Sequence, residues 1–486
     1  MSRVIDILRK QGPMLSGLLE KAICKNFSVS NEAARKTVSR ARSPVQKLKV
    51  FPFCNNQVFC YLEEQYNSQL YRERLYEALK QDSASVSMII RALENSDFIM
   101  NKSLLPVFSK SPISNTKGHR NFDRIISDLI EQEVLVEACE DYYAISQMYC
   151  GGEVNLTYSK SKEQISRIVV GDFITWAGNL NIMAYNSVKV FPDEAIFAHF
   201  KWFSTVPSYI TPLYDYVRKR PGFVLVDVVI KANASIEDVS FFVEKINTIR
   251  NFKKLPCFMP VLITNGVSNE AFKYLKENKV FIGVLSNLFD RKYTNTLMNM
   301  YNVLCNATAV LLKEPEKIEK LIEEIAKSEG RFYNAMGDLF ECMVGLFYNR
   351  IGSKYIELNK QIPNGRGGKY EMDVLVDRDG KIQVIECKAY RSMVDKEYIE
   401  KWLSTRIPAF RRFLCDIYPN RKLEFSIWSL GGFDKEAEKL LANHKNSAKK
   451  YSLTYYTKKE IYELACAYND NAFCDQINKH FKDYGT

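Results

Sequence analysis

The sequence predicts a multidomain α/β protein with an α+β amino-terminal region. The chain has 486 residues, which is too long for one ordinary hydrophobic core. Hydrophobic residues make up 46% of it and aromatic residues 13%, so the chain can pack as globular domains and is not intrinsically disordered. Amphipathic helical segments alternate with short apolar segments typical of strands. We expect four domains, at residues 1–68, 69–150, 151–325 and 326–486.

The first fifty residues carry an excess of positive charge. They contain eleven Lys or Arg against three Asp or Glu, within a chain of formal net charge +11. Such an excess indicates an anionic partner. Within it, "SVSNEAARKTVSRAR" (28–42) predicts a short helix that is capped by Ser30 or Asn31 and carries four basic residues, Arg35, Lys36, Arg40 and Arg42.

The neighbours of this basic helix suggest a DNA-binding module. The apolar helix "GLLEKAIC" precedes it, and "KLKVFPFCNNQVFCYLE" follows as two strands with a turn near Asn55-Asn56. This order resembles a winged helix with the basic helix in the reading position, which implies that its four basic residues bind DNA. A solvated basic helix in a structural module is the alternative.

Residues 69–150 predict a second winged-helix-like or helical domain. Its end is acidic rather than basic, which favours a spacer or a protein contact; the acidic residues are Glu131, Glu133, Glu137, Glu140 and Asp141.

The cysteines and histidines exclude several kinds of site. Twelve cysteines are scattered without any C-x-x-C pair, and the four histidines lie far apart, so neither a zinc ribbon nor a disulfide framework is expected. No apolar run is long enough for a secretion signal or a membrane span. We expect a cytoplasmic protein with reduced thiols and no membrane partner.

The segment "KYEMDVLVDRDGKIQVIECKAY" (369–390) predicts a β-hairpin that turns at Asp379-Gly380. Counting back from that turn places Asp373 opposite Glu386. Two opposed acids on a buried face are destabilising unless a cation lies between them. The alternative is a shifted register, with Glu371 and Lys388 forming a surface ion pair.

Three motifs in the carboxy-terminal third resemble the PD-(D/E)xK phosphodiesterase superfamily. They are "GDLFE", which ends in Glu341 on an amphipathic helix, then "YEMDVLV" and "VIECK". The resemblance covers residues 326–460, with Met372 where the motif has proline. It implies a restriction-endonuclease-like α/β fold with a mixed central sheet.

The resemblance also implies a catalytic site at Glu341, Asp373, Glu386 and Lys388. Asp373 and Glu386 correspond to the metal ligands, and Glu341 to the acid that supports the metal shell. Lys388 corresponds to the residue that orients or helps deprotonate the attacking water. The expected metal is Mg²⁺, with Mn²⁺ as a substitute.

Two basic segments flank these motifs. Arg366 and Lys369, in a Gly-rich loop just before the strand that carries Asp373, are expected to contact phosphates. A flexible surface loop without a function is the alternative. The helix that follows carries Lys401, Arg406, Arg411 and Arg412, which form either a groove for the substrate or a solvated face.

Residues 151–325 are predicted to repeat the same fold without the acids. "NGVSNEAFKYL" (from Asn265) aligns with "GGFDKEAEKLL" (from Gly431), in the same order as other matches. The alignment places Thr175 on Glu341, Val229 on Glu386 and Lys231 on Lys388. Chance similarity between two α/β segments is the alternative.

These observations lead us to expect a metal-dependent endonuclease that cleaves DNA, in restriction or defence against foreign DNA. Two other functions remain open: an RNA-cleaving effector, and a non-catalytic DNA-binding regulator that uses the nuclease fold as a scaffold. The expected partner is DNA, with a second copy of the chain or other subunits of a restriction or defence system as further alternatives.

Overall fold

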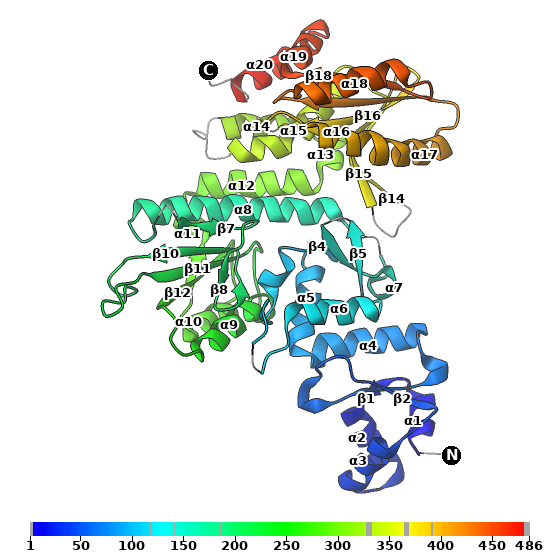
Figure 1. Ribbon diagram of the computed structural model, residues 1–486, viewed down its shortest axis with the longest axis vertical. Coiled ribbons are helices and arrows are strands. Elements are labelled where there is room, and N and C mark those ends of the chain that lie inside the picture. Colours follow the sequence, from blue (N-terminus) through cyan, green and yellow to red (C-terminus); the bar gives the residue numbers. More distant parts are fainter. Residues whose placement is uncertain are drawn as a thin grey trace. The chain divides into compact units, whose positions relative to one another are not determined.

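The computed structural model describes residues 3–480 except 117, 140, 153, 185–186, 327–332, 364–368 and 390–391. The protein has a mixed α/β architecture, as predicted (Figure 1). It divides into two compact units, Met1–Ser159 with Val169–Leu288, and Lys160–Ile168 with Phe289–Thr486. No helix among the described residues is both long enough and apolar enough to cross a membrane.

The first unit begins with three helices and a three-stranded antiparallel sheet of order β1-β3-β2. Its elements are α1 (Arg3–Gln11), β1 (Met14–Leu15), α2 (Ser16–Phe27), α3 (Asn31–Arg40), β2 (Val45–Leu48) and β3 (Phe59–Leu62). Ser30 caps α3 by accepting a hydrogen bond from the Ala33 amide at 3.3 Å, as the sequence predicts. The predicted turn is also confirmed, because Asn55 and Asn56 both have positive φ angles.

A second small sheet follows, with the same strand order. Its order β4-β6-β5 again places the third strand between the first and the second, and all pairs are antiparallel. The elements are α4 (Gln69–Asp82), α5 (Ala84–Glu94), β4 (Ile99–Asn101), α6 (Phe122–Glu131), β5 (Leu135–Cys139), β6 (Tyr142–Ile145) and α7 (Gln147–Cys150). The apolar side of α6 is buried through Phe122, Ile125 and Leu129.

The rest of the first unit contains a five-stranded mixed sheet of order β13-β12-β11-β10-β7. Helix α8 (Leu156–Asn179) precedes it, and its residues Lys160–Ile168 group with the second unit. The other elements are β7 (Lys189–Val190), β8 (Ile196–Phe197), β9 (Phe200–Lys201), β10 (Ser204–Ser208), β11 (Gly222–Val229), α9 (Ile236–Arg250), β12 (Phe258–Thr264), α10 (Asn269–Glu277), β13 (Phe281–Val284) and α11 (Leu285–Leu288).

The second unit contains another five-stranded mixed sheet, of order β14-β15-β16-β17-β18. Before it come α12 (Arg291–Cys305), α13 (Ala307–Lys313), α14 (Pro315–Ala326) and α15 (Tyr333–Arg350). The sheet and its helices are β14 (Tyr355–Pro363), β15 (Lys369–Arg378), β16 (Lys381–Lys388), α16 (Lys396–Lys401), α17 (Ile407–Ile417), β17 (Lys422–Ser429), α18 (Lys435–Ser447), β18 (Ser452–Thr457), α19 (Lys458–Ala467) and α20 (Asn471–His480). A π-helical turn, Trp402–Arg406, joins α16 to α17.

Helices cover both faces of the β14-β15-β16-β17-β18 sheet, so its central strands are apolar on both sides. On one face Trp402 and Phe410 pack against Val384 and other strand residues. On the other, Phe347 of α15 lies 5.9 Å from the ring of Trp428, measured between ring centroids. An ionisable side chain on β16 is therefore placed where charge is costly.

The two five-stranded sheets share strand order and strand direction. In each, the first three strands are antiparallel and the last two pairs are parallel. Single bridges follow the third and fourth strands of both, Ala234 with Val267 and Val394 with Phe433. This arrangement is the one that a duplicated module requires.

The shared register also corrects one prediction. In the middle sheet, Val226 pairs with Val261 and lies eight residues before the bridged Ala234. In the sheet of the second unit, Glu386 pairs with Ile427 and likewise lies eight residues before the bridged Val394. Val226 and Val228 therefore take the places of Glu386 and Lys388. The prediction that Val229 and Lys231 take them is wrong.

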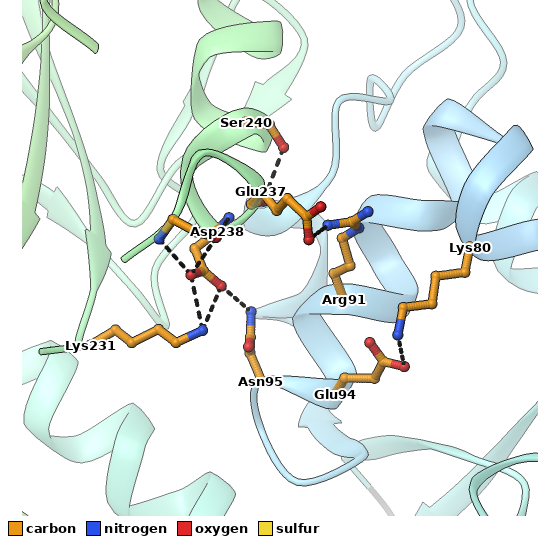
Figure 2. A network of polar contacts seen from close by, with 9 residues as sticks. Lys80, Arg91, Glu94, Asn95, Lys231, Glu237, Asp238 and Ser240 are labelled. Atoms are coloured by element: carbon orange, nitrogen blue, oxygen red, sulfur yellow. Dashed lines mark hydrogen bonds and ion pairs between the residues drawn. The ribbon is translucent and has the colours of Figure 1, made fainter. Parts of the chain in front are cut away.

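Lys231 instead stabilises the start of α9. It lies beyond the end of β11 and binds Asp238 at 2.9 Å (Figure 2). Asp238 also accepts from Asn95 at 3.0 Å and forms a capping box with Ser235. Figure 2 shows Lys231 and Asn95 converging on Asp238, next to an ion pair between Arg91 and Glu237.

Asp227 of β11 and Lys245 of α9 form a fully buried ion pair. Lys245 Nζ binds Asp227 Oδ2 at 2.7 Å, and both side chains have no exposed surface. The same ammonium donates to the carbonyl oxygens of Val107 at 2.7 Å and Lys201 at 3.0 Å. Asp227 Oδ1 accepts from the Phe203 amide, so both charges are satisfied by hydrogen bonds.

Candidate functional site

The β15–β16 hairpin forms as the sequence predicts. Asp379 and Gly380 have φ angles of 50° and 76°, which matches the turn that two-residue hairpins prefer. Arg378 pairs with Lys381, and the ladder continues to Val374 and Ile385. Since the next pair in this register is Asp373 and Glu386, the predicted register is confirmed and the shifted alternative is wrong.

Lys388 lies between the two opposed acids. Its Nζ is 2.8 Å from Glu386 Oε1 and 3.9 Å from Asp373 Oδ2. Asp373 Oδ2 also accepts a hydrogen bond from the Cys387 amide at 2.8 Å. The protein thus supplies one of the positive charges that the opposed carboxylates require.

Two further residues bind Glu386, and sequence analysis did not assign them to the site. Arg406 Nη1 lies 2.9 Å from Glu386 Oε1, and the Tyr398 hydroxyl donates to the same oxygen. Arg406 is the last residue of the π-helical turn, a geometry that often occurs at functional sites. Arg406 was one of four basic residues expected in a groove or on a solvated face, whereas no pattern pointed to Tyr398.

A fourth acid, Glu371, joins the site with its own cation. Glu371 Oε1 lies 2.8 Å from Nζ of Lys160, which is 211 residues earlier in the chain, on α8. The pair expected for a shifted register, Glu371 with Lys388, is not the one that forms. A contact between such distant residues has no local signal in the sequence.

Burial and mutual repulsion raise the pKa values of two of the acids. Burial and the neighbouring Glu386 raise the pKa of Asp373 to about 7. Burial, with the charges of Asp373 and Glu371, raises the pKa of Glu341 on α15 well above its usual value. Two carboxyl groups therefore hold protons more tightly than free carboxyl groups do.

Glu386 differs from these two acids because its pKa is lowered. Burial alone would raise its pKa, but the charges of Lys388 and Arg406 outweigh burial, and the net pKa lies below the usual value. Burial also acts to lower the pKa of Lys388, yet Glu386 and Asp373 raise it well above normal. The four acids and three bases named here leave one excess negative charge when all are ionised.

The site has oxygen atoms to offer a hard cation. Glu386 Oε2 and Glu371 Oε2 are buried and have no hydrogen-bond partner in the described part of the chain. Among the described residues, no group of three acidic, histidine or cysteine side chains has the spacing of a metal site. Carboxylate oxygens are nevertheless the protein ligands that Mg²⁺ prefers, together with water and phosphate oxygens.

The predicted DNA-binding residues belong to both units. Helix α3 belongs to the first unit, where it buries Ala34 and Val38; its basic residues Arg35, Lys36 and Arg40, and Arg42 just after it, are exposed. Lys36 binds Glu32 at 2.6 Å. In the second unit Lys369 begins β15 and is half-buried, while Arg366 lies outside the described residues.

Comparisons with known proteins give little information about this chain. No family model matches it, and no curated protein matches it. A crystal structure of a protein of unknown function, AF1548, aligns with 24% of this chain at 18% identity, with a TM-score of 0.18. This chain spans about half of that protein, 56% of its length. The match is too weak to assign a fold.

Proposed function

We propose that the protein is a metal-dependent endonuclease that hydrolyses phosphodiester bonds in DNA. The observation that carries the proposal is Lys388 held between Asp373 and Glu386 at the end of a buried hairpin, where Glu386 keeps one buried oxygen without a partner. Structural ion pairs rarely leave such an oxygen unsatisfied.

Each residue has a defined part in this mechanism. Asp373, Glu386 and Glu341 would hold Mg²⁺, which when bound polarises the scissile phosphate and lowers the pKa of water. Lys388 would direct its ammonium to the attacking water and the phosphate oxygens. Tyr398 and Arg406 hold Glu386 in one orientation through its Oε1.

We assign DNA binding to the amino-terminal module. Two observations support this assignment. The order of helices and strands, with the third strand between the first two, agrees with the order expected of a winged helix, and the basic residues of α3 are exposed. The middle sheet is proposed to be a degenerate copy of the nuclease fold, because Val226 and Val228 replace the acid and the lysine. Restriction or defence is the biological role proposed for this combination.

Incubation of the purified protein with plasmid DNA and structured RNA tests the proposal directly. The reactions contain Mg²⁺, Mn²⁺ or EDTA. We expect DNA cleavage with either metal and none with EDTA. Cleavage of RNA alone would identify an RNA-cleaving effector, and binding without cleavage would identify a DNA-binding regulator.

Reversal of charge on α3 is expected to weaken DNA binding. In the variant Arg35→Glu, Lys36→Glu, Arg40→Glu, each lost phosphate contact should reduce the slope of log K against log salt by about one unit. Fluorescence anisotropy over a salt series measures this slope.

A variant with the same change of net charge in the same module is the matched control. Lys10→Glu, Lys21→Glu, Lys25→Glu alters exposed residues of α1 and α2. It should lose less affinity than the α3 variant. Equal binding by wild type and the α3 variant at every salt concentration would assign α3 to structure alone.

A further inference from the structure

The hairpins at corresponding places in the two five-stranded sheets differ in the length of their connections. Strands β15 and β16 are joined by Asp379 and Gly380 alone, whereas β10 and β11 are joined by residues 209–221. This connection, which we call the tyrosine loop, extends from the β10–β11 hairpin (Figure 1). The sheet that lacks the acids therefore carries a surface feature that the other sheet does not have.

The tyrosine loop exposes large apolar side chains beside basic ones. Tyr209 is 63% exposed, Tyr216 65% and Val217 93%. Ring centroids of Tyr209 and Tyr214 lie 6.2 Å apart, and those of Tyr214 and Tyr216 lie 4.9 Å apart. The residues that follow are basic: Arg218, Lys219 and Arg220.

Internal contacts hold the loop in one shape. The Asp215 carboxylate accepts from the amides of Val217 at 3.1 Å and Arg218 at 3.0 Å, and from Arg220 Nε at 3.4 Å. Leu213 is buried at the base, where Gly222 allows close approach, since a Cβ there would lie 2.5 Å from the Leu213 carbonyl oxygen. The exposed rings are thus presented by an ordered turn.

This surface has the chemistry that binds nucleic-acid strands whose bases are unpaired. Aromatic faces stack on bases of any sequence, and neighbouring cations bind the phosphates. A duplex hides its base faces, so exposed tyrosines gain more from unpaired nucleotides. The net charge of +11 on the chain also favours a polyanion over a neutral partner.

We propose that the tyrosine loop binds unpaired nucleotides of a nucleic-acid strand, with Tyr209 and Tyr216 stacking on bases and Arg218 and Lys219 contacting phosphates. The idea that this strand is the substrate rests on the proposed nuclease function, whereas binding of the strand to the loop does not depend on it. The middle sheet would then hold a strand that it cannot cut.

Anisotropy of labelled oligonucleotides with the full chain in EDTA tests the proposal, because cleavage is then suppressed. Tyr209→Ser with Tyr216→Ser should weaken binding of single-stranded DNA by about tenfold or more for each tyrosine that carries a base. Duplex binding should change less. Arg218→Ala with Lys219→Asn should reduce the slope of log K against log salt for single-stranded DNA by about 1.4 units. Asparagine is chosen because it tolerates the φ of 50° at position 219.

An exposed aromatic residue elsewhere in the same unit gives the matched control. Phe272 on α10 is 44% exposed, and Lys276 Nζ lies 5.7 Å from its ring centroid. Phe272→Ser with Lys276→Ala should bind single-stranded DNA as wild type does. Thermal melting checks that every variant is folded.

Two results would overturn the proposal. One is single-strand binding by the loop variants equal to that of wild type. The other is that the loop variants bind single-stranded DNA as wild type does but lose binding to vesicles of anionic phospholipid, which would make the loop a membrane contact. Loop-dependent binding in a protein that does not cleave with Mg²⁺ would support the loop site and reject the nuclease proposal.

Discussion

Replacement of Asp373 by asparagine is expected to abolish DNA cleavage while the fold is retained. Asparagine keeps an oxygen that can accept from the Cys387 amide, but it removes the anionic oxygen needed to hold Mg²⁺. Loss of several kcal/mol of transition-state stabilisation corresponds to a rate decrease of about 10³-fold or more. The metal-free variant should be at least as stable as wild type, because one member of a buried pair of like charges is removed.

Single-turnover cleavage and thermal melting in EDTA measure the two effects. Asp377→Asn is the matched control, since Asp377 lies on the same strand and pairs with Arg421 instead. It should retain cleavage. Wild-type cleavage by Asp373→Asn would end the assignment of this site.

Glu386→Ala should also abolish cleavage, but with the opposite effect on stability. From the sequence alone, both acids are expected to destabilise the metal-free protein. The structure changes that expectation for Glu386, whose Oε1 binds Lys388 and Arg406. Its removal leaves two cations without their shared partner, so the melting temperature in EDTA should fall.

The largest loss of stability is expected for Lys245→Met. This change leaves Asp227 buried without its cation, and removal of one partner from a buried ion pair costs about 3–5 kcal/mol. Burial raises the pKa of Asp227 to about 6 even with Lys245 present, so the variant should bury a protonated Asp227. The carbonyl oxygens of Val107 and Lys201 also lose a donor.

Urea denaturation of the full chain measures the shift in midpoint. Lys231→Met is the control, because Lys231 is half exposed in its pair with Asp238 and an exposed pair contributes at most about 1 kcal/mol. A double variant, Asp227→Val with Lys245→Met, should be more stable than Lys245→Met alone. Equal midpoints for Lys245→Met and Lys231→Met would show that the buried pair does not stabilise the fold.

Local signals in the sequence were enough for the hairpin. The Asp-Gly turn sets the register, and the register alone places Asp373 opposite Glu386. Lys160 and Tyr398 could not be assigned to the site because tertiary packing, rather than spacing along the chain, brings them to it.

The incorrect placement of Lys231 has a physical cause as well. Matching identical letters aligned Lys231 with Lys388, but β11 is buried on both faces and ends at Val229. A lysine two residues later is free to leave the sheet and bind Asp238 on α9. The register of a strand is set by which of its residues are buried and apolar, so an alignment based on matching charged residues can place the strand incorrectly.

The contacts of Glu386 also affect conformational entropy. A glutamate side chain loses as much as about 1.5–2 kcal/mol of rotamer freedom when it is fixed. Lys388, Arg406 and Tyr398 fix Glu386 through Oε1 when the chain folds, and Oε2 has no partner among the described residues. A ligand that binds Oε2 therefore meets a side chain whose freedom is already lost, and more of its interaction energy remains as affinity.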